Sequence, residues 1–182
     1  MSSPAHIRYQ THVGTRVPDL LPSPPQRGHA VDFLAEKDAD LIPVVLSQIL
    51  DTCINGITLS DPHQDDCPLV YANEAFELIT GYDRHEILGR NCRFLQGDDQ
   101  DQGEIDKISE AMRTETQATV TLRNYRKDGT LFHNQFTIRP IFDREGSLLY
   151  FLGIQYDVTE QVKAQEELAM LERQLKRAGG RQ

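Results

Sequence analysis

The sequence predicts an α+β fold, in which a five-stranded antiparallel sheet carries short helices on one face and has a flanking helix at each end. Three observations lead to this prediction. Two short apolar segments come first, several short helical segments follow, and three longer segments of alternating polarity come last. This order favours a three-strand meander beside two shorter strands, with the helices covering one side of the sheet.

The strands and helices of this central region are separated by turn residues. Lys127-Asp128-Gly129-Thr130 is a signal for a tight hairpin, and Asp143 to Gly146 make the next turn. We expect strands at residues 54–60, 68–72, 117–126, 131–142 and 147–157. Between the second and third strands we expect helices at residues 73–80, 83–88, 91–95 and 101–114.

The two ends of the chain differ in composition from the centre. Five of the nine prolines fall in the first 25 residues, so we expect residues 1–37 to form a flexible arm. Helical spacing of apolar residues predicts a cap helix within residues 38–54, from about Asp40 to Cys53. Residues 159–182 contain a short heptad pattern and predict an amphipathic helix, which either packs on its own domain or forms a coiled coil.

Charge and cysteine content narrow the classes of function. The net charge of the chain is −9. Residues 1–30 carry +2 and residues 159–182 carry +1, so the segment between them carries −12. An acidic core repels a phosphate backbone, so we expect no nucleic-acid partner. The three cysteines form neither a CxxC pair nor a disulfide framework, which argues against a metal site. Without a signal peptide or a long apolar segment, we expect a cytoplasmic protein that does not enter the membrane.

Each of the three long strands places one carboxamide on its inward face, among apolar residues. A buried amide without a partner costs about 1–3 kcal/mol, so these amides need one another, water or the polar edge of a ligand. Amides both donate and accept, which suits a planar heterocycle, and Gly153 would leave room for such a ring. The alternative is that they lie at strand ends or pair with the backbone. The three inward sets are Val120, Leu122 and Asn124; Phe132, Asn134, Phe136 and Ile138; and Leu149, Phe151, Gly153 and Gln155.

The segment from Gly89 to Gly97 reads Gly-Arg-Asn-Cys-Arg-Phe-Leu-Gln-Gly. It resembles the flavin-binding signature of LOV domains, the blue-light-sensing branch of the PAS superfamily. The resemblance implies a PAS-like sheet, a flavin-binding domain over residues 55–158 with FMN as cofactor, and a photoreceptor rather than an enzyme. It extends over residues 55–160, through Asn73 to Phe76, Ile87-Leu88-Gly89, Asn124-Tyr125, Lys127 to Gly129, Asn134, Phe136 and Tyr150 to Gly153.

The resemblance also implies roles for individual residues. Cys92 would be the photoactive thiol, whose sulfur bonds reversibly to carbon C4a of the flavin after blue-light excitation. Gln155 would sense this change, because protonation of the flavin N5 turns an acceptor into a donor and rotates the amide. The other implied flavin contacts are Asn91 and Gln96 to the ribityl chain and phosphate end, Arg93 to the phosphate, Asn124 and Asn134 to the pyrimidine edge, and Leu95, Phe136 and Gly153.

One position departs from the family pattern. Relatives that hold phosphate-bearing flavin most tightly carry a second arginine on the long helix, where this sequence has Ser109. Arg113 lies one helical turn later and could reach over the same face, whereas Lys107 points the other way. We therefore expect weaker retention of FMN, with riboflavin as an alternative cofactor.

The outward face of the fifth strand is unusually apolar, and so is that of the first strand. Such a strip requires cover, either from the flanking helices of the same chain or from a second subunit. We expect a homodimer through the outer face of the sheet and the flanking helices, with an unidentified signalling protein as a further partner. The strip consists of Ile57, Leu59, Tyr150, Leu152, Ile154 and Tyr156.

Other classes of function stay open on the sequence alone. A PAS-type binding module for another ligand would show no flavin absorption, and a dimerisation module without light output would give no light-dependent readout. A thiol enzyme using Cys92 would need a nearby histidine as base. His85 lies seven residues upstream, and His133 is predicted to face outward.

Overall fold

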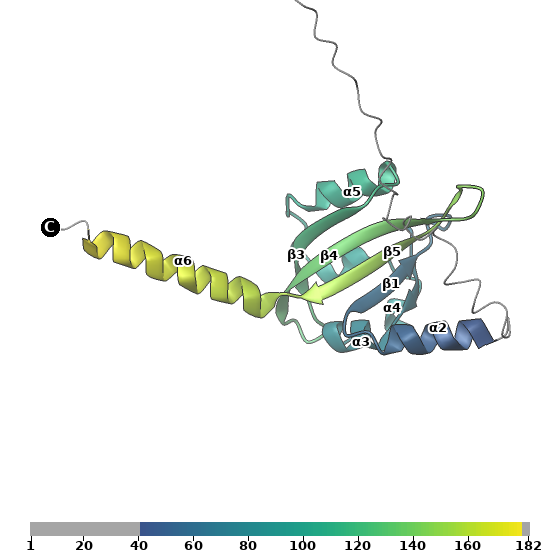
Figure 1. The fold of residues 1–182 in the computed structure, drawn as a ribbon, viewed down its shortest axis with the longest axis horizontal. Coiled ribbons are helices and arrows are strands. Elements are labelled where there is room, and N and C mark those ends of the chain that lie inside the picture. Colours follow the sequence, from purple (N-terminus) through teal and green to yellow (C-terminus); the bar gives the residue numbers. More distant parts are fainter. Residues whose placement is uncertain (1–40, 180–182) are drawn as a thin grey trace, which may run out of the picture. The chain divides into compact units, whose positions relative to one another are not determined.

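A computed structural model describes residues 41–179, and its centre is a five-stranded sheet in the order β2-β1-β5-β4-β3 (Figure 1). Every pair of neighbouring strands is antiparallel. This arrangement confirms the predicted fold class. The strands are β1 (Gly56–Ser60), β2 (Leu69–Ala72), β3 (Ala118–Tyr125), β4 (Leu131–Phe142) and β5 (Leu148–Asp157).

Each predicted helical segment contains a helix of the structure. The segment at residues 91–95 forms a tight 3₁₀ turn, η1, and the segment at 101–114 becomes helical only at Ile105. The helix starts later than predicted because the residues before Ile105 are held against β3. The Gln102 side chain bonds both the backbone N–H and the backbone C=O of Arg123. The helices are α2 (Leu41–Asp51), α3 (Glu74–Thr80), α4 (Arg84–Ile87), η1 (Cys92–Gln96), α5 (Ile105–Arg113) and α6 (Thr159–Gly179).

Two predictions concern segments that the structure does not fully describe. The Pro-rich arm predicted over residues 1–37 lies outside the described residues, as do residues 38–40 of the cap helix and the last three residues of the chain.

None of the helices that the structure does describe combines the length and the apolar content needed to cross a bilayer.

The buried side chain of Asn73 joins three elements at one corner of the sheet. Its Oδ1 accepts hydrogen bonds from the backbone N–H of Ile57 on β1 and of Phe76 in the first turn of α3. Its Nδ2 donates to the backbone oxygens of Leu50 at the end of α2 and of Asn55. The amide therefore caps α3 and fixes the end of α2 beside β1.

The helices between β2 and β3 pack on the inward face of the sheet through two apolar clusters. The first joins β2 with α3, α4 and η1, and the second joins α5 with β4 and β5. The first cluster contains Leu69, Ala72, Phe76, Ile87 and Leu95, and the second contains Ala111, Ile138 and Phe151. This packing leaves the opposite, outward face of the sheet uncovered by these helices.

The strand alternation predicted from the sequence is confirmed on β3 and β4, where the inward residues are buried or half-buried. It is wrong at one position on β5, because Leu149 is exposed. The pairing of β4 with β5 shifts between Ile141 and Phe142, so that Phe142 is opposite Leu148. A bulge of one residue moves the next side chain to the other face of a strand, and Leu148 packs against the second cluster in place of Leu149.

The apolar strip on the outward face runs across β1 and β5. Ile57 is paired with Ile154, and Leu59 with Leu152, so these four side chains share one face. Tyr150 and Tyr156 continue the strip and are 36% and 40% exposed. On α6 the apolar residues of the predicted heptad pattern are also exposed, including Leu168, Leu171 and Leu175.

Candidate functional site

A cavity of about 430 Å³ opens between the inward face of the sheet, η1, α5 and the loop that joins β1 to β2. Its floor combines apolar and amide side chains of β3 and β4, namely Leu122, Asn124, Asn134, Phe136 and Ile138. Its walls include Asn91, Cys92, Arg93 and Gln96 from the η1 segment, and Ile105, Ile108, Ser109 and Met112 from α5. The β1–β2 loop contributes Asp66 and Cys67 to the rim.

Cys92 is the first residue of η1, and it lines the cavity. Asn91 caps this helix, because its Oδ1 accepts a hydrogen bond from the backbone N–H of Arg93. This cap fixes the backbone of the first turn of η1 and therefore the position of Cys92. Burial raises the pKa of the Cys92 thiol to about 12, so the sulfur keeps its proton at neutral pH.

Asn124 and Asn134 form a linked pair of buried amides on neighbouring strands. The Nδ2 of Asn134 donates to the Oδ1 of Asn124 at 2.9 Å, and the Nδ2 of Asn124 donates to the backbone oxygen of Arg123. The Oδ1 of Asn134 is buried and has no hydrogen-bond partner among the described residues. An unpaired buried acceptor costs about 1–3 kcal/mol, which a ligand donor at this position would recover.

Gln155 lies on the central strand β5, directly across from Phe136 of β4. Its Nε2 donates to the hydroxyl oxygen of Thr58 on β1 at 3.1 Å. Its Oε1 is buried and without a partner in the part of the chain that the structure describes. The amide is therefore held at one end and free to accept a hydrogen bond at the other.

Gly153 makes room for side chains of its own strand and of the two neighbouring strands. A methyl group built on it would lie 2.5 Å from the Thr58 hydroxyl oxygen and 2.9 Å from both the Gln155 Nε2 and the Phe136 ring. The sequence predicted that this space would admit a ligand ring. In the structure it admits Thr58 and Gln155, and Gly153 itself is not part of the cavity wall.

Gly153→Ala is expected to destabilise the fold by about 1–3 kcal/mol, because the added methyl group forces a shift in a tightly packed sheet. Urea unfolding of the two proteins measures this difference in the free energy of unfolding. Gly103→Ala is the matched control, because no atom lies within 4 Å of the added methyl group there. An equal effect of the two substitutions would contradict the close packing at Gly153.

The cavity brings together seven of the predicted ligand contacts, namely Asn91, Cys92, Arg93, Gln96, Asn124, Asn134 and Phe136. Gly153 and Gln155 lie next to Phe136 but are not part of the wall. Leu95 is buried in the first apolar cluster, and it is not among the lining residues either. Arg113 is exposed, pairs with Glu110 one turn earlier on α5, and is not among the residues that line the cavity.

Several lining residues did not emerge from the sequence. Ile105, Ile108 and Met112 follow helical spacing, and that periodicity could have identified them as the cavity side of α5. Asp66 and Cys67 carry no such signal. Both adopt left-handed backbone conformations, with φ of 64° and 47°, which turn the β1–β2 loop back towards η1.

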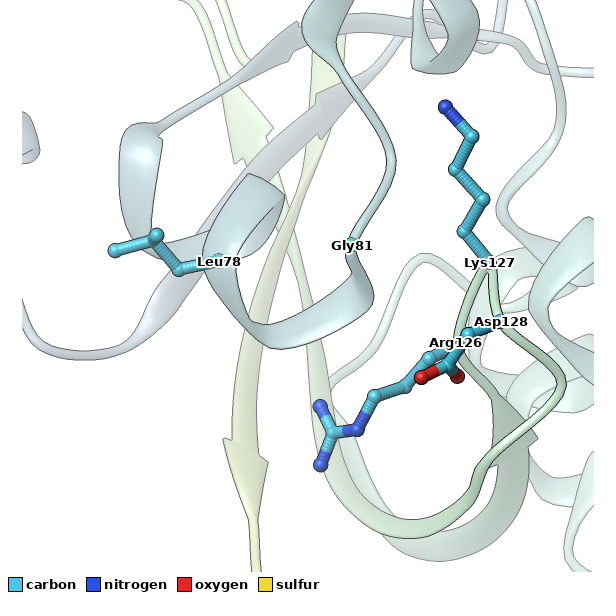
Figure 2. A pocket seen from close by; sticks show the side chains of 5 residues that line it. All are labelled: Leu78, Gly81, Arg126, Lys127 and Asp128. Carbon is cyan, nitrogen blue, oxygen red and sulfur yellow. The ribbon is translucent and has the colours of Figure 1, made fainter.

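A second, more open pocket of about 460 Å³ lies beside the β3–β4 turn (Figure 2). In Figure 2 the Arg126 and Lys127 side chains extend in different directions. Arg126 pairs with Asp157 and the backbone of Ile79, and Lys127 pairs with Glu86. Both cations of this pocket are therefore paired with groups of the same chain.

The contact of Lys127 with Glu86 also involves a group of residues whose spacing would suit a metal ion, namely Asp83, His85 and Glu86. One carboxylate of this group is therefore already paired with a cation.

Comparison with known proteins identifies the family to which this fold belongs. The family model described as PAS domain matches residues 54–160. A blue-light photoreceptor of Listeria monocytogenes is 48% identical over 124 residues, which cover 68% of this chain and 49% of the relative. Blue-light-activated histidine kinase 1 of Erythrobacter litoralis is 51% identical over 107 residues, which cover 59% of this chain and 30% of the relative.

Solved structures agree with this assignment. An RNA-binding light-oxygen-voltage receptor is 37% identical with a TM-score of 0.70, over 84% of this chain and 41% of that one. A variant of Vivid is 36% identical with a TM-score of 0.53, over 56% of this chain and 81% of that one. The chain therefore belongs to the PAS domain family and, within it, to the LOV branch. It spans about half the length of the Listeria relative and less than a third of the Erythrobacter one.

Proposed function

We propose that this chain is a blue-light receptor that binds a flavin in the cavity beside Cys92. The observation that carries the proposal is that Cys92 and the linked amides of Asn124 and Asn134 line the same cavity. Two relatives support it by their names, one a blue-light photoreceptor and the other a blue-light-activated histidine kinase. When bound, the flavin would supply blue-light absorption and an electrophilic carbon, C4a, and Cys92 would supply the thiol that faces it.

The residues of the cavity fit a flavin. The unpaired Oδ1 of Asn134 can accept a hydrogen bond from a ring N–H, and Asn124 lies beside it. Phe136 offers an apolar surface to a planar ring. Asn91 and Gln96 provide polar groups for a ribityl chain, and Arg93 provides a cation for a phosphate.

The state of Cys92 favours a light-driven reaction over a thiol enzyme. A catalytic thiolate needs a lowered pKa, usually from a histidine or another cation, whereas burial alone shifts the Cys92 pKa and raises it. No histidine is among the described residues that line the cavity. In the dark the thiol would therefore stay protonated and unreactive, and excitation would provide the energy for bond formation.

Gln155 is the proposed link between the cavity and the end of the sheet. Its unpaired Oε1 and its bond to Thr58 leave the amide able to exchange donor and acceptor by rotation. A rotation would alter the contact between β5 and β1. At the end of β5, Asp157 accepts hydrogen bonds from the backbone and hydroxyl of Thr159, the first residue of α6. A change on β5 therefore reaches the start of that helix.

A homodimer is the proposed form of the output. The strip on the outward face and the apolar residues of α6 are only partly covered in the described part of the chain, and a second copy would bury both. The net charge of −9 favours a protein rather than a nucleic acid as any further partner.

We also propose that the preference for FMN over riboflavin is weak. Ser109 lines the cavity where tight-binding relatives place an arginine, and Arg113, which pairs with Glu110, is not among the lining residues. Arg93 is the only arginine among the described lining residues. A phosphate would thus gain a single cationic partner, and the ratio of the dissociation constants of riboflavin and FMN measures its contribution.

The direct test is the absorption spectrum of the full chain, purified with flavin, before and after blue light. We expect the blue band to bleach and then to return in the dark. A chain that takes up no flavin would contradict the proposal. A chain that binds flavin with an unchanged spectrum would instead be the dimerisation module without light output.

A further inference from the structure

The β1–β2 loop, residues 61–68, places an acidic side chain against Arg93, the one cation among the described residues that line the cavity. The Asp66 carboxylate forms an ion pair with the guanidinium of Arg93, and both residues belong to the cavity wall. Both side chains are more than half exposed, at 59% and 57%. The pair is therefore at the mouth of the cavity, where it is open to solvent and to an entering ligand.

The backbone of the loop fixes the position of this carboxylate. The Nδ2 of Asn91 donates hydrogen bonds to the backbone oxygens of Asp66 and Cys67. Asp66 has a φ of 64°, a left-handed conformation that only a few residue types adopt without strain. Asp66 therefore contacts the η1 segment through its backbone as well as its side chain. The backbone contacts fix the loop in the position from which the carboxylate reaches Arg93.

A phosphate group that used Arg93 would meet this carboxylate. The two anions would have to share one guanidinium, or Asp66 would have to release it. Asp61 of the same loop lies near enough to act on the thiol of Cys67, as Asp66 does, so the rim carries further negative charge. A ligand without a phosphate, such as riboflavin, would meet no such competition.

We propose that Asp66 is a specificity-determining residue, which competes with the phosphate of the bound flavin for Arg93. This inference rests on the proposed function and deepens it. Ser109 accounts for the lack of a second cation, whereas Asp66 reduces what the first cation can contribute. The structure thereby provides two independent reasons for weak discrimination between FMN and riboflavin, and each can be changed separately.

The test is Asp66→Asn in the full chain, with FMN and riboflavin titrated separately against the flavin-free protein. We expect the dissociation constant of FMN to fall by about two- to fivefold, the range in which exposed ion pairs contribute, and that of riboflavin to stay unchanged. Asparagine keeps the size of the side chain and tolerates a positive φ, so the loop retains its conformation.

Two further variants make the test specific to the pair. Asp65→Asn removes the same charge from the neighbouring residue, which has no ion pair among the described residues, and it should change FMN binding less. In an Arg93→Gln background, Asp66→Asn should no longer favour FMN, because the shared cation is gone.

The outcomes separate this inference from the function on which it rests. If Asp66→Asn leaves both dissociation constants unchanged, or tightens FMN and riboflavin equally, the inference is wrong while flavin binding stands. An equal gain from Asp65→Asn would also overturn it, because general charge would then explain the effect. If the parent chain binds neither flavin, the proposed function falls, and the role of Asp66 falls with it.

Discussion

Cys92→Ala is expected to abolish the reversible bleaching of the blue band while the chain still takes up flavin. The sulfur is the only atom of this residue that can bond to the flavin, and alanine removes it with little change in volume. The remaining contacts of the cavity, including the Asn124 and Asn134 amides and Phe136, do not depend on the thiol. Absorption spectra recorded before, during and after blue light measure the effect.

Cys67→Ala is the matched control for this experiment. Cys67 is a second free thiol on the wall of the same cavity, and burial together with the charges of Asp61 and Asp66 raises its pKa. The reversible bleaching should survive its replacement. If bleaching persisted in Cys92→Ala and disappeared in Cys67→Ala, Cys67 would be the photoactive thiol and the proposed role of Cys92 would be wrong. Loss of flavin from Cys92→Ala would show that the thiol is needed for binding itself.

The sheet and most of the cavity could be predicted because they depend on local patterns. Period-two alternation on β3 and β4 correctly placed Asn124 and Asn134 on the buried face. The unbroken segment from Gly89 to Gly97 located Cys92, and the structure puts that segment on the cavity wall. In both cases the information lies within ten neighbouring residues.

The departures arise where distant residues decide the geometry. Leu149 faces outward because of a bulge in the pairing of β4 with β5, and no residue of the turn signals that shift. The space beside Gly153 is filled by Thr58, which is nearly a hundred residues earlier in the chain and adjacent only in the sheet. The position of Asp66 likewise depends on Asn91 and Arg93.

Arg113 is a different case, because its partner was visible in the sequence. Glu110 lies three residues earlier on the same helix, a spacing at which opposite charges pair on one face. From helical geometry alone, we expect the Arg113 side chain to reach over the face of the helix that carries Ser109. The local ion pair competes with that reach.

Gln155→Leu is expected to separate light absorption from its structural consequence. Leucine has a similar volume and removes both the Nε2 donor to Thr58 and the unpaired Oε1, so the loss of one hydrogen bond is offset by the loss of an unsatisfied acceptor. The variant should therefore fold, bind flavin and bleach in blue light. It should not respond beyond the cavity, because leucine cannot exchange donor and acceptor.

Two measurements on the dark and illuminated protein test this separation. In the parent, light should change the mass measured by light scattering, the hydrogen exchange of the first turn of α6 near Thr159, or both, because β5 carries Gln155 and ends at the Asp157 contact with that turn. In Gln155→Leu both changes should be lost. Gln100→Leu, the same substitution at an exposed loop position, should behave like the parent. A full light response in Gln155→Leu would mean that the signal leaves the cavity through another element, and the half-buried Asn91 and Cys92 contacts of η1 would then be the next to test.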